Sequence, residues 1–246
     1  MNSNVAKELL NKLVELNSKG PIKIIEKYGA AGIGLAIEES LGIKMNSSKD
    51  PDYKGIELKA TQGKIFNTNK TLLAMVPDWK ASPIHSYADL VILYGYPTER
   101  SSKELNCSVN GLSPNRQGLM LEVDEVDGYL EEWHITDDGE RTLLLLWSIE
   151  KIALRFKEKH PETFWISAKK LNTKEFQITK ILHVSEPKMA NVDDLPNLLT
   201  DGSLFIDHVA HQKPDGTHRD HGMLFRTAKD PRDLFTVIGV YELGND

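Results

Sequence analysis

Apolar residues recur at helical spacing in the first segment of the chain. Between residues 4 and 17, leucines and a valine occupy positions 5, 9, 10, 13 and 16, and Gly20-Pro21 follows. This spacing predicts an amphipathic helix that ends before the Gly-Pro pair. The same reasoning predicts helices over residues 30–41, stopped by Gly42, and 148–159, stopped by His160-Pro161.

Runs rich in β-branched and aromatic residues predict strands between and after these helices. They cover residues 55–61, 71–76, 89–94, 118–123, 164–168, 175–184, 203–209, 223–227 and 235–241. Helices and strands are interspersed, and no repeat or long linker separates them. The sequence therefore predicts one mixed fold, α/β or α+β.

Composition is that of an ordinary globular protein. The 246 residues are 40% hydrophobic and 27% charged, which excludes disorder, collagen and coiled coil. Cys107 is the single cysteine, so no internal disulfide forms, and we expect a reducing compartment. No basic stretch with an apolar run opens the sequence, and no apolar run is long enough for a membrane span. We expect a cytoplasmic protein without a membrane partner.

Charge is unevenly distributed along the chain. The net charge of −6 alone argues against nucleic acid, because binding phosphates requires lysine and arginine. However, residues 122–140 contain nine acidic residues and no lysine or arginine, whereas residues 141–188 contain ten lysines and arginines against five glutamates. Either both segments are solvated, or one face meets a polyanion while another stays acidic.

The most informative segment runs from Lys49 to Ala60. On a strand that begins near Gly55, alternation sends Glu57 and Lys59 to one side and the apolar residues between them to the other. Asp50 lies close by in the preceding turn. Two carboxylates and a backbone carbonyl are the hard oxygen ligands that Mg²⁺ prefers, and a lysine beside them stabilises charge on a phosphate or orients water. This pattern predicts phosphodiester hydrolysis.

Context makes this pair distinctive. An acidic residue two positions before a lysine occurs four times, at Asp52/Lys54, Glu57/Lys59, Asp78/Lys80 and Glu186/Lys188. Only Glu57 and Lys59 combine strand-like alternation with an acid upstream and a Pro/Gly-rich turn. The competing interpretation is an exposed strand with a surface ion pair of little energetic value.

Asp50, six intervening residues and Glu57-Leu58-Lys59 resemble the active-site signature of the PD-(D/E)xK nucleases, in the D-x6-E-L-K form of the repair nickase MutH. Upstream, Leu35–Gly42 resembles the helix of that group in which Leu-Gly follows a glutamate. Chain length, the Gly55–Lys59 core and the His-rich C-terminal segment are most similar to the MvaI/BcnI type II restriction endonucleases. The resemblance implies a PD-(D/E)xK core of mixed sheet and helices.

The resemblance implies roles for these residues. Asp50 and Glu57 would hold Mg²⁺, Lys59 would act on water and phosphate, and Glu38 would assist. Asp52 is the alternative acid, because it follows Pro51 but stands only four residues before Glu57. Glu39 is the alternative to Glu38.

The resemblance also implies cleavage of both strands of DNA at a short G/C-rich site such as CCWGG, by a monomer, with a cognate methyltransferase in the same host. It divides the chain into a catalytic lobe over residues 1–170 and a β-rich recognition lobe over residues 171–246, with a shared core.

Three segments are candidate DNA contacts. The polar connection after the catalytic strand would project from the edge of the site, with amide and ammonium donors for the minor groove. Lys169 and Lys170, at a predicted strand end, would contact phosphates. The connection contributes Gln62, Lys64, Asn67, Asn69 and Lys70.

The third segment holds four of the eight histidines, within residues 208–221. Its strand, Pro-Asp-Gly turn and strand predict a β-ribbon, and an ordinary His-rich surface hairpin is one interpretation of it. Under the nuclease interpretation, the ribbon reads the major groove through His218, Arg219, Asp220, His221 and Arg226. Zinc binding by its two H-x-x-H pairs is the alternative. However, a strand does not bring the imidazole nitrogens of such a pair together as a helix would.

The function predicted is therefore a Mg²⁺-dependent, site-specific endonuclease acting on double-stranded DNA. A MutH-like repair nickase or a resolvase is the alternative with the same chemistry. A DNA-binding protein without catalysis, or a metal-binding protein that uses the histidine cluster, is the alternative from another class.

Overall fold

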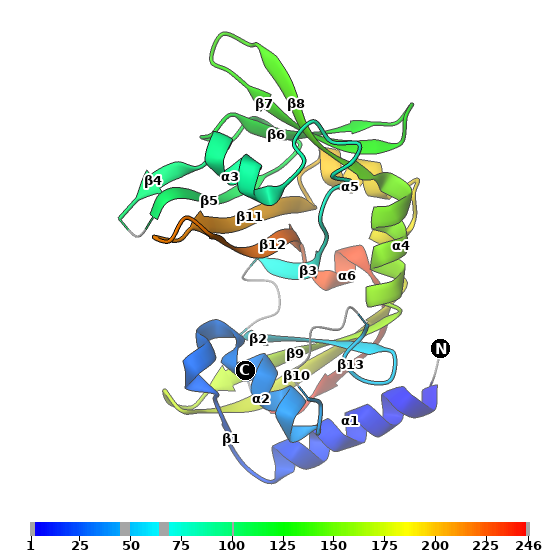
Figure 1. The fold of residues 1–246 in the computed structure, drawn as a ribbon. Helices are drawn as coiled ribbons and strands as arrows, with labels where there is room; N and C mark the ends of the chain where they lie inside the picture. The colour runs from blue at the N-terminus through cyan, green and yellow to red at the C-terminus, as the bar shows by residue number, and fades with distance from the viewer. Residues whose placement is uncertain (1–2, 45–49, 64–68, 100, 245–246) are drawn as a thin grey trace. The chain divides into compact units, whose positions relative to one another are not determined.

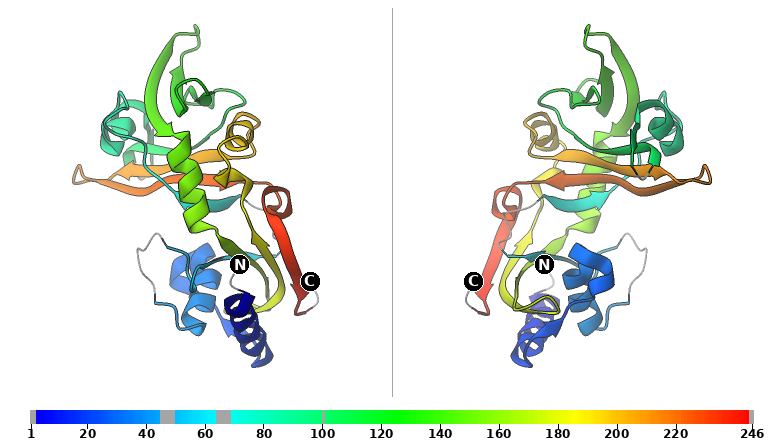
Figure 2. Two further views of the ribbon diagram at one scale, coloured as in Figure 1. Left: turned by 90° about the vertical axis from the view of Figure 1, so that its right-hand side faces the viewer. Right: turned by 90° about the vertical axis from the view of Figure 1, so that its left-hand side faces the viewer.

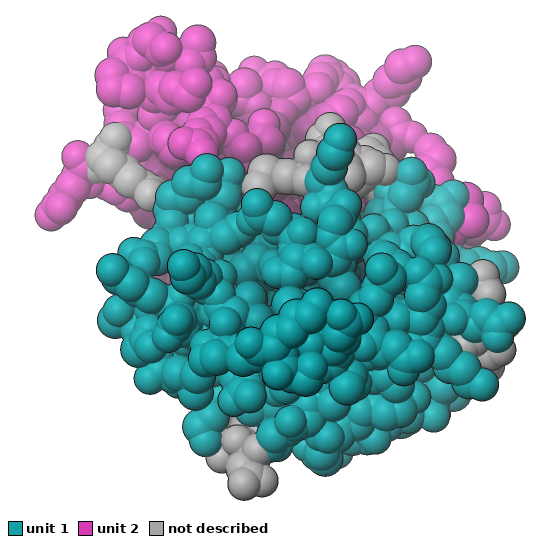
Figure 3. Space-filling model, turned by 90° about the horizontal axis from the view of Figure 1, so that it is seen from below, with its two compact units in different colours: residues 1–68, 157–188, 229–246 teal, residues 69–156, 189–228 magenta. Residues whose placement is uncertain are grey.

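The computed structural model of the chain describes residues 3–44, 50–63, 69–99 and 101–244. The chain forms two compact units, each assembled from separated segments (Figure 3). Unit 1 contains residues 1–68, 157–188 and 229–246, and unit 2 contains residues 69–156 and 189–228. Figure 1 labels the elements of both units. In the described part of the chain, no helix is long and apolar enough to cross a membrane.

Unit 1 is built on a mixed five-stranded sheet. Its order is β1-β10-β9-β2, and β13 also pairs with β10. The neighbours β2 and β9 are parallel, and the other pairs are antiparallel. The strands are β1 (Ile22–Lys23), β2 (Ile56–Gln62), β9 (Glu162–Lys170), β10 (Glu175–Ser185) and β13 (Thr236–Glu242).

Helices cover one face of this sheet (Figure 1). Leu9 and Leu13 of α1 (Ser3–Ser18) and Ile37 of α2 (Gly32–Ser40) are buried in one core with Ile56 and Leu58 of β2. Both helices were predicted from their apolar spacing and are confirmed. Unit 1 also contains η1 (Glu26–Ala31) and α6 (Pro231–Leu234).

Unit 2 contains two sheets, of order β3-β12-β11-β5-β4 and β6-β7-β8. The helices α3 (Tyr87–Tyr94) and α5 (Leu195–Thr200) belong to it, whereas α4 (Ile149–Lys159) and η2 (Lys188–Ala190) cross from one unit to the other. Its strands are β3 (Lys70–Ala74), β4 (Tyr96–Thr98), β5 (Ser101–Val109), β6 (Leu119–Asp124), β7 (Tyr129–Ile135), β8 (Arg141–Ser148), β11 (Phe205–Gln212) and β12 (His218–Thr227).

One predicted strand is wrong. Residues 89–94 form part of helix α3, because Ser86 caps the helix and its hydroxyl accepts a hydrogen bond from the amide of Asp89 at 3.1 Å. Leu90 and Val91 are fully buried, so packing of the apolar run outweighs its β-like composition. Strands β1, β4, β5, β7 and β8 were not predicted, and β7 carries acidic residues that hide its alternation of buried and exposed positions.

The compact units do not follow the lobe boundary expected between residues 170 and 171. That boundary falls between β9 and β10, which pair antiparallel in the sheet of unit 1. Strands β5 to β8, which precede it, belong to unit 2. The order of segments along the chain does not predict the units, because hydrogen bonding between strands determines which segments share a core.

Candidate active site

Strand β2 presents Glu57 and Lys59 on the face opposite the helices. Ile56 and Leu58 enter the core with α1 and α2, so alternation sends the two charged residues to the other side. In parallel register, Glu57 pairs with Thr163 and Lys59 with Trp165 of β9. The strand and its alternation were predicted from the sequence and are confirmed.

A tight turn leads into the strand. Tyr53 and Ile56 exchange backbone hydrogen bonds of 2.9 and 2.8 Å, and the two residues between them, Lys54 and Gly55, have φ of +46° and +93°. Positive φ at both positions is what a two-residue type I′ turn requires. The turn folds the preceding segment back along β2, and Asp52 Oδ2 accepts a hydrogen bond from the Leu58 amide at 2.9 Å.

Glu57 is the buried centre of the charged cluster. Its side chain is 2% exposed, and its two oxygens lie 2.8 Å from Lys59 Nζ and 2.7 Å from Lys159 Nζ. Burial raises the pKa of Glu57, the Lys59 charge opposes that shift, and the carboxylate of Asp52 adds to it. The cluster therefore holds carboxylates of like charge beside two ammonium groups.

Of the two upstream acids, the structure brings Asp52 into this cluster. Asp52 Oδ1 lies 3.9 Å from Lys159 Nζ, whereas Asp50 meets the same ammonium through its backbone carbonyl at 2.8 Å. Asp52 also raises the pKa values of Glu38 and Glu57. The sequence spacing favoured Asp50, but the tight turn places Asp52, the alternative acid, beside the strand. The geometry thus favours Asp52.

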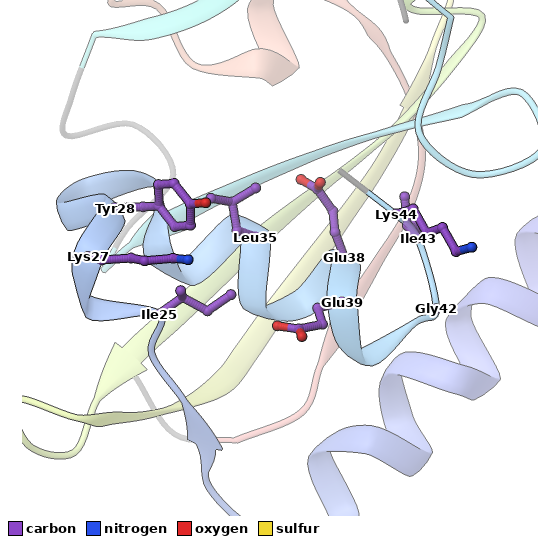
Figure 4. Close-up of a pocket in the computed structure, with 9 residues that line it drawn as sticks. All are labelled: Ile25, Lys27, Tyr28, Leu35, Glu38, Glu39, Gly42, Ile43 and Lys44. Atoms are coloured by element: carbon purple, nitrogen blue, oxygen red, sulfur yellow. The ribbon is translucent and has the colours of Figure 1, made fainter. Parts of the chain in front are cut away.

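Glu38 faces the same cluster from helix α2. Burial, followed by the charges of Asp52 and Glu57, raises the pKa of Glu38 to about 6. Glu39 is exposed. Both glutamates line a cavity of about 490 Å³, where their side chains point in different directions (Figure 4). The preference for Glu38 over Glu39 therefore has a physical basis in its proximity to the other carboxylates.

Lys159 is a residue of the cluster that sequence patterns did not indicate. It is the last residue of α4, about a hundred positions from the motif, and it looks like an ordinary basic residue at a helix C-terminus. The structure brings its ammonium among oxygens of Asp50, Asp52 and Glu57. Only tertiary structure reveals this proximity.

The donor set suits a hard divalent cation. The carboxylates of Asp52 and Glu57 and the carbonyl of Asp50 surround one ammonium, and Mg²⁺ uses one or two carboxylates and leaves other positions to water and phosphate. Within the described ranges, no three or more His, Cys, Asp or Glu side chains group as a metal site. The carboxylates of Asp52 and Glu57 are the side chains of this cluster that could hold such an ion.

The histidine cluster shows no zinc site. Its four histidines, at positions 208, 211, 218 and 221, all lie in the described part of the chain, and they belong to no such group there. His208 is fully buried, and its Nε2 lies 2.9 Å from a carboxylate oxygen of Glu132. One histidine of the cluster is therefore buried in the interior of unit 2, where it pairs with a carboxylate.

Some predicted DNA contacts converge at the far end of β2. Gln62 ends this strand in register with Ala168 of the parallel strand β9, and the exposed side chains of Lys169 and Lys170 follow. This end therefore gathers one amide and two ammonium groups.

The connection after β2 is only partly described. Lys64 and Asn67 lie outside the described residues. Asn69 is exposed, whereas Lys70 is 4% exposed on β3 of unit 2, so its side chain is not presented to a ligand in this conformation.

The predicted ribbon is a hairpin of β11 and β12, which extend side by side (orange in Figure 2). Gly216 has φ of +82° in the Pro-Asp-Gly turn, as predicted. Arg219, Asp220 and His221 are exposed on β12, and His218 is half-buried. Arg226 instead forms an ion pair with Asp207, which limits its freedom to contact a base.

Ion pairs involve residues of both oppositely charged segments of the sequence. Arg141, which opens the basic segment, forms an ion pair with Glu122 of the acidic segment at 2.5 Å and stacks on Trp133. Lys159 belongs to the carboxylate cluster, and Lys180 lies 2.6 Å from Glu242. Local pairing accounts for much of the charge pattern.

Comparisons with known proteins define the class of this protein as restriction endonuclease. The model of the MvaI/BcnI restriction endonuclease family matches residues 10–235, so the chain belongs to this family of site-specific DNA endonucleases. A comparison with curated protein sequences finds no significant match.

Solved structures of one restriction endonuclease, MvaI, resemble the chain. MvaI in complex with its cognate DNA substrate has a TM-score of 0.80 and 19% identity, and the match covers 98% of this chain and 97% of that chain. MvaI in the absence of DNA has a TM-score of 0.59 and 16% identity, with 96% and 97% covered. The mixed restriction-endonuclease fold expected from the motif is confirmed.

Proposed function

We propose that this protein is a Mg²⁺-dependent type II restriction endonuclease that cleaves both strands of DNA at a short G/C-rich site such as CCWGG. The observation that carries the proposal is the charged cluster at β2, where Glu57 and Lys59 form an ion pair and the carboxylate of Asp52 raises the pKa of Glu57. Membership of the MvaI/BcnI family supports the reaction class. MvaI, with the same fold, is known in complex with cognate DNA.

Asp52 and Glu57 would hold the cation, with Asp50 now the less favoured ligand. When bound, a divalent cation there would polarise the scissile phosphate and make the attacking water more acidic. Lys59, whose ammonium lies 2.8 Å from Glu57, orients that water and stabilises charge that develops on the phosphate. Glu38, half-buried near both carboxylates, holds the proton or water shared with them.

DNA recognition is assigned to two regions. Gln62, Lys169 and Lys170 supply donors for phosphates and groove edges near β2. Asn69, in the connection that follows β2, is a further candidate donor. The β11–β12 hairpin reads bases in the major groove through the side chains at its exposed end, since arginine suits guanine, aspartate suits cytosine and histidine suits purine N7. The residues are His218, Arg219, Asp220 and His221.

We further propose that the protein acts as a monomer in the cytoplasm of a host with a cognate DNA methyltransferase. A monomer has one carboxylate cluster, so it would cut the two strands in successive steps. Methylation of the same site by the partner enzyme would protect host DNA from an activity that recognises a short sequence.

The test is digestion of unmethylated phage DNA with Mg²⁺, followed by sequencing of the ends. We expect ends that share one short G/C-rich sequence. Glu57→Gln and Lys59→Ala should be inactive, and Lys157→Met, which alters an exposed lysine of α4, should cleave normally. Nicks in one strand would indicate a repair nickase, and sequence-independent cuts at branched DNA a resolvase. Specific binding without cleavage, or full turnover by Lys59→Ala, would contradict the proposed chemistry.

A further inference from the structure

The ammonium of Lys159 lies inside the oxygen cluster of the candidate site. It is 2.7 Å from Glu57 Oε2, 2.8 Å from the backbone oxygen of Asp50 and 3.9 Å from Asp52 Oδ1. Its side chain is 13% exposed, and that of Glu57 is 2% exposed. The ammonium is therefore held within the site, in contrast to a surface lysine that meets an acid in solvent.

These three oxygens are the donor types that a divalent cation would use there. Two come from carboxylates and one from a carbonyl, which is hard oxygen coordination. Lys59, the lysine of the motif, differs in this respect: its ion pair is with the other oxygen of Glu57, Oε1, at 2.8 Å. Of these two lysines, Lys159 is the one that meets the oxygens of both carboxylates.

We propose that Lys159 is the internal counter-ion of the metal-free site, and that its ammonium occupies the place of the divalent cation until the cation displaces it. A buried carboxylate without a partner is strongly destabilising, so an internal cation keeps Glu57 and Asp52 together before metal arrives. The inference rests on the proposed function, because it assigns the metal to these carboxylates.

Displacement is physically feasible for this residue. Lys159 is at the end of its helix, and a lysine carries its charge on a flexible four-carbon stem, so the ammonium can leave without moving the backbone. An ammonium also carries one charge where Mg²⁺ carries two, and two carboxylates favour the higher charge. Lys159 is thus a positioning residue for the site, and its ammonium competes with the metal.

The first experiment follows Lys159 in the unmodified protein. An amine-reactive reagent is applied to the chelator-treated full chain with and without Mn²⁺, and labelling is quantified by mass spectrometry. We expect Lys159 to be protected without metal and labelled several-fold more with it. Lys157, exposed two residues earlier on the same helix, is the internal control and should not change. Bound Mn²⁺ with unchanged labelling of Lys159 would overturn the inference.

The second experiment measures metal affinity and stability without DNA. Removal of the competing charge in Lys159→Met should tighten Mn²⁺ binding by about tenfold, measured by calorimetry, and lower the Tm in chelator. Lys157→Met should match the unmodified protein. If Lys159→Met folds poorly, the double variant Glu57→Gln/Lys159→Met, which lacks both charges, should recover much of the Tm. Unchanged or weaker Mn²⁺ binding by folded Lys159→Met would overturn the inference.

Failure of the proposed function gives a different result. In that case the unmodified protein binds no Mn²⁺, and Glu57→Gln changes neither binding nor the response of Tm to metal. If the unmodified protein binds Mn²⁺ through Glu57, the metal assignment stands, and the behaviour of Lys159 alone decides the inference.

Discussion

Glu57 is the side chain that interacts with most of the other charged groups of the site. It is almost completely buried and meets an ammonium at each oxygen, while Asp52 adds a like charge. A buried carboxylate needs a positive partner, and under the proposed function that partner is either an ammonium or a metal ion. The acid that shares this task can be identified by substitution.

We expect Asp52→Asn to lower the single-turnover cleavage rate by about a hundredfold or more, the usual scale for removal of a charge-stabilising group. Asp50→Asn should retain most activity, because Asp50 meets Lys159 through its main chain. DNA binding in Ca²⁺ should stay near normal in both variants, since these groups act on the phosphate and not on base edges. An inactive Asp50→Asn with an active Asp52→Asn would restore the assignment that sequence spacing favours.

Glu38 links the site to pH. Burial and two neighbouring carboxylates raise its pKa from 4.5 to about 6, so the native protein holds this proton more tightly than the unfolded chain. Ionised Glu38 therefore destabilises the native state, with no penalty below about pH 4.5 and the full penalty above about pH 6.

In metal-free buffer, Glu38→Gln should be more stable than the unmodified protein at pH 8 by about 1 kcal/mol, the shift being discounted for partial solvent exposure. The two should converge at about pH 4, as measured by denaturant unfolding across pH. Glu39→Gln, which alters the exposed neighbour, is the matched control. A Glu38→Gln protein that is less stable at pH 8 would show that the ionised carboxylate is favoured in the native site.

At the scale of elements, the sequence predicted the helices and the strand whose formation depends on residues close together in the chain. The strand of Glu57 and Lys59 follows from alternation within seven residues, and α1 and α2 follow from apolar spacing. Helix α3 was missed because a single cap and burial decided between helix and strand for an apolar run. Asp52 was only the alternative acid in the sequence prediction, because spacing along the chain does not show how the type I′ turn brings Asp52 back beside β2.

The β11–β12 hairpin is the element that tests base reading. We expect Arg219→Ala to lose roughly 1–3 kcal/mol at the cognate site and to relax discrimination at one G·C pair, because arginine reads guanine O6 and N7 together. Affinities for cognate and singly substituted duplexes at matched salt measure both effects. A melting curve should be unchanged, since Arg219 is exposed.

Lys213→Ala is the matched control, because it removes one exposed positive charge from the turn of the same hairpin. It should weaken binding to all duplexes alike, if at all. If Arg219→Ala also loses affinity evenly, Arg219 contacts a phosphate. If neither Arg219→Ala nor His221→Ala changes discrimination, the hairpin is not the reader, and the segment after β2 becomes the main candidate.

At the scale of the whole molecule, each unit combines segments that lie far apart in the sequence. Lys159 reaches Glu57 because α4 ends in unit 1, and β10 completes a sheet begun by β2 and β9. A split at residue 170 could not capture this arrangement. Charge behaves similarly: Glu132, which looks like part of a solvated acidic run, is fully buried against His208.

The net charge of −6 means that the molecule as a whole repels DNA, so binding must come from local groups of cations. Lys169 and Lys170, exposed where β9 runs beside the catalytic strand, form such a group. We expect the double variant Lys169→Gln/Lys170→Gln to bind all sequences more weakly. The slope of log affinity against log salt should fall by about one unit for each phosphate that the variant no longer neutralises.

The control for this variant separates direct phosphate binding from overall charge. Lys7→Gln/Lys12→Gln removes the same two charges from exposed positions on α1, which packs on the sheet face opposite Glu57. Binding to a noncognate duplex is measured over a range of salt concentrations without cleavage. If only the β9 variant flattens the salt dependence, those lysines contact phosphates. If both flatten it equally, net charge alone explains the weaker binding, and if only the α1 variant does, DNA approaches the other face of the sheet.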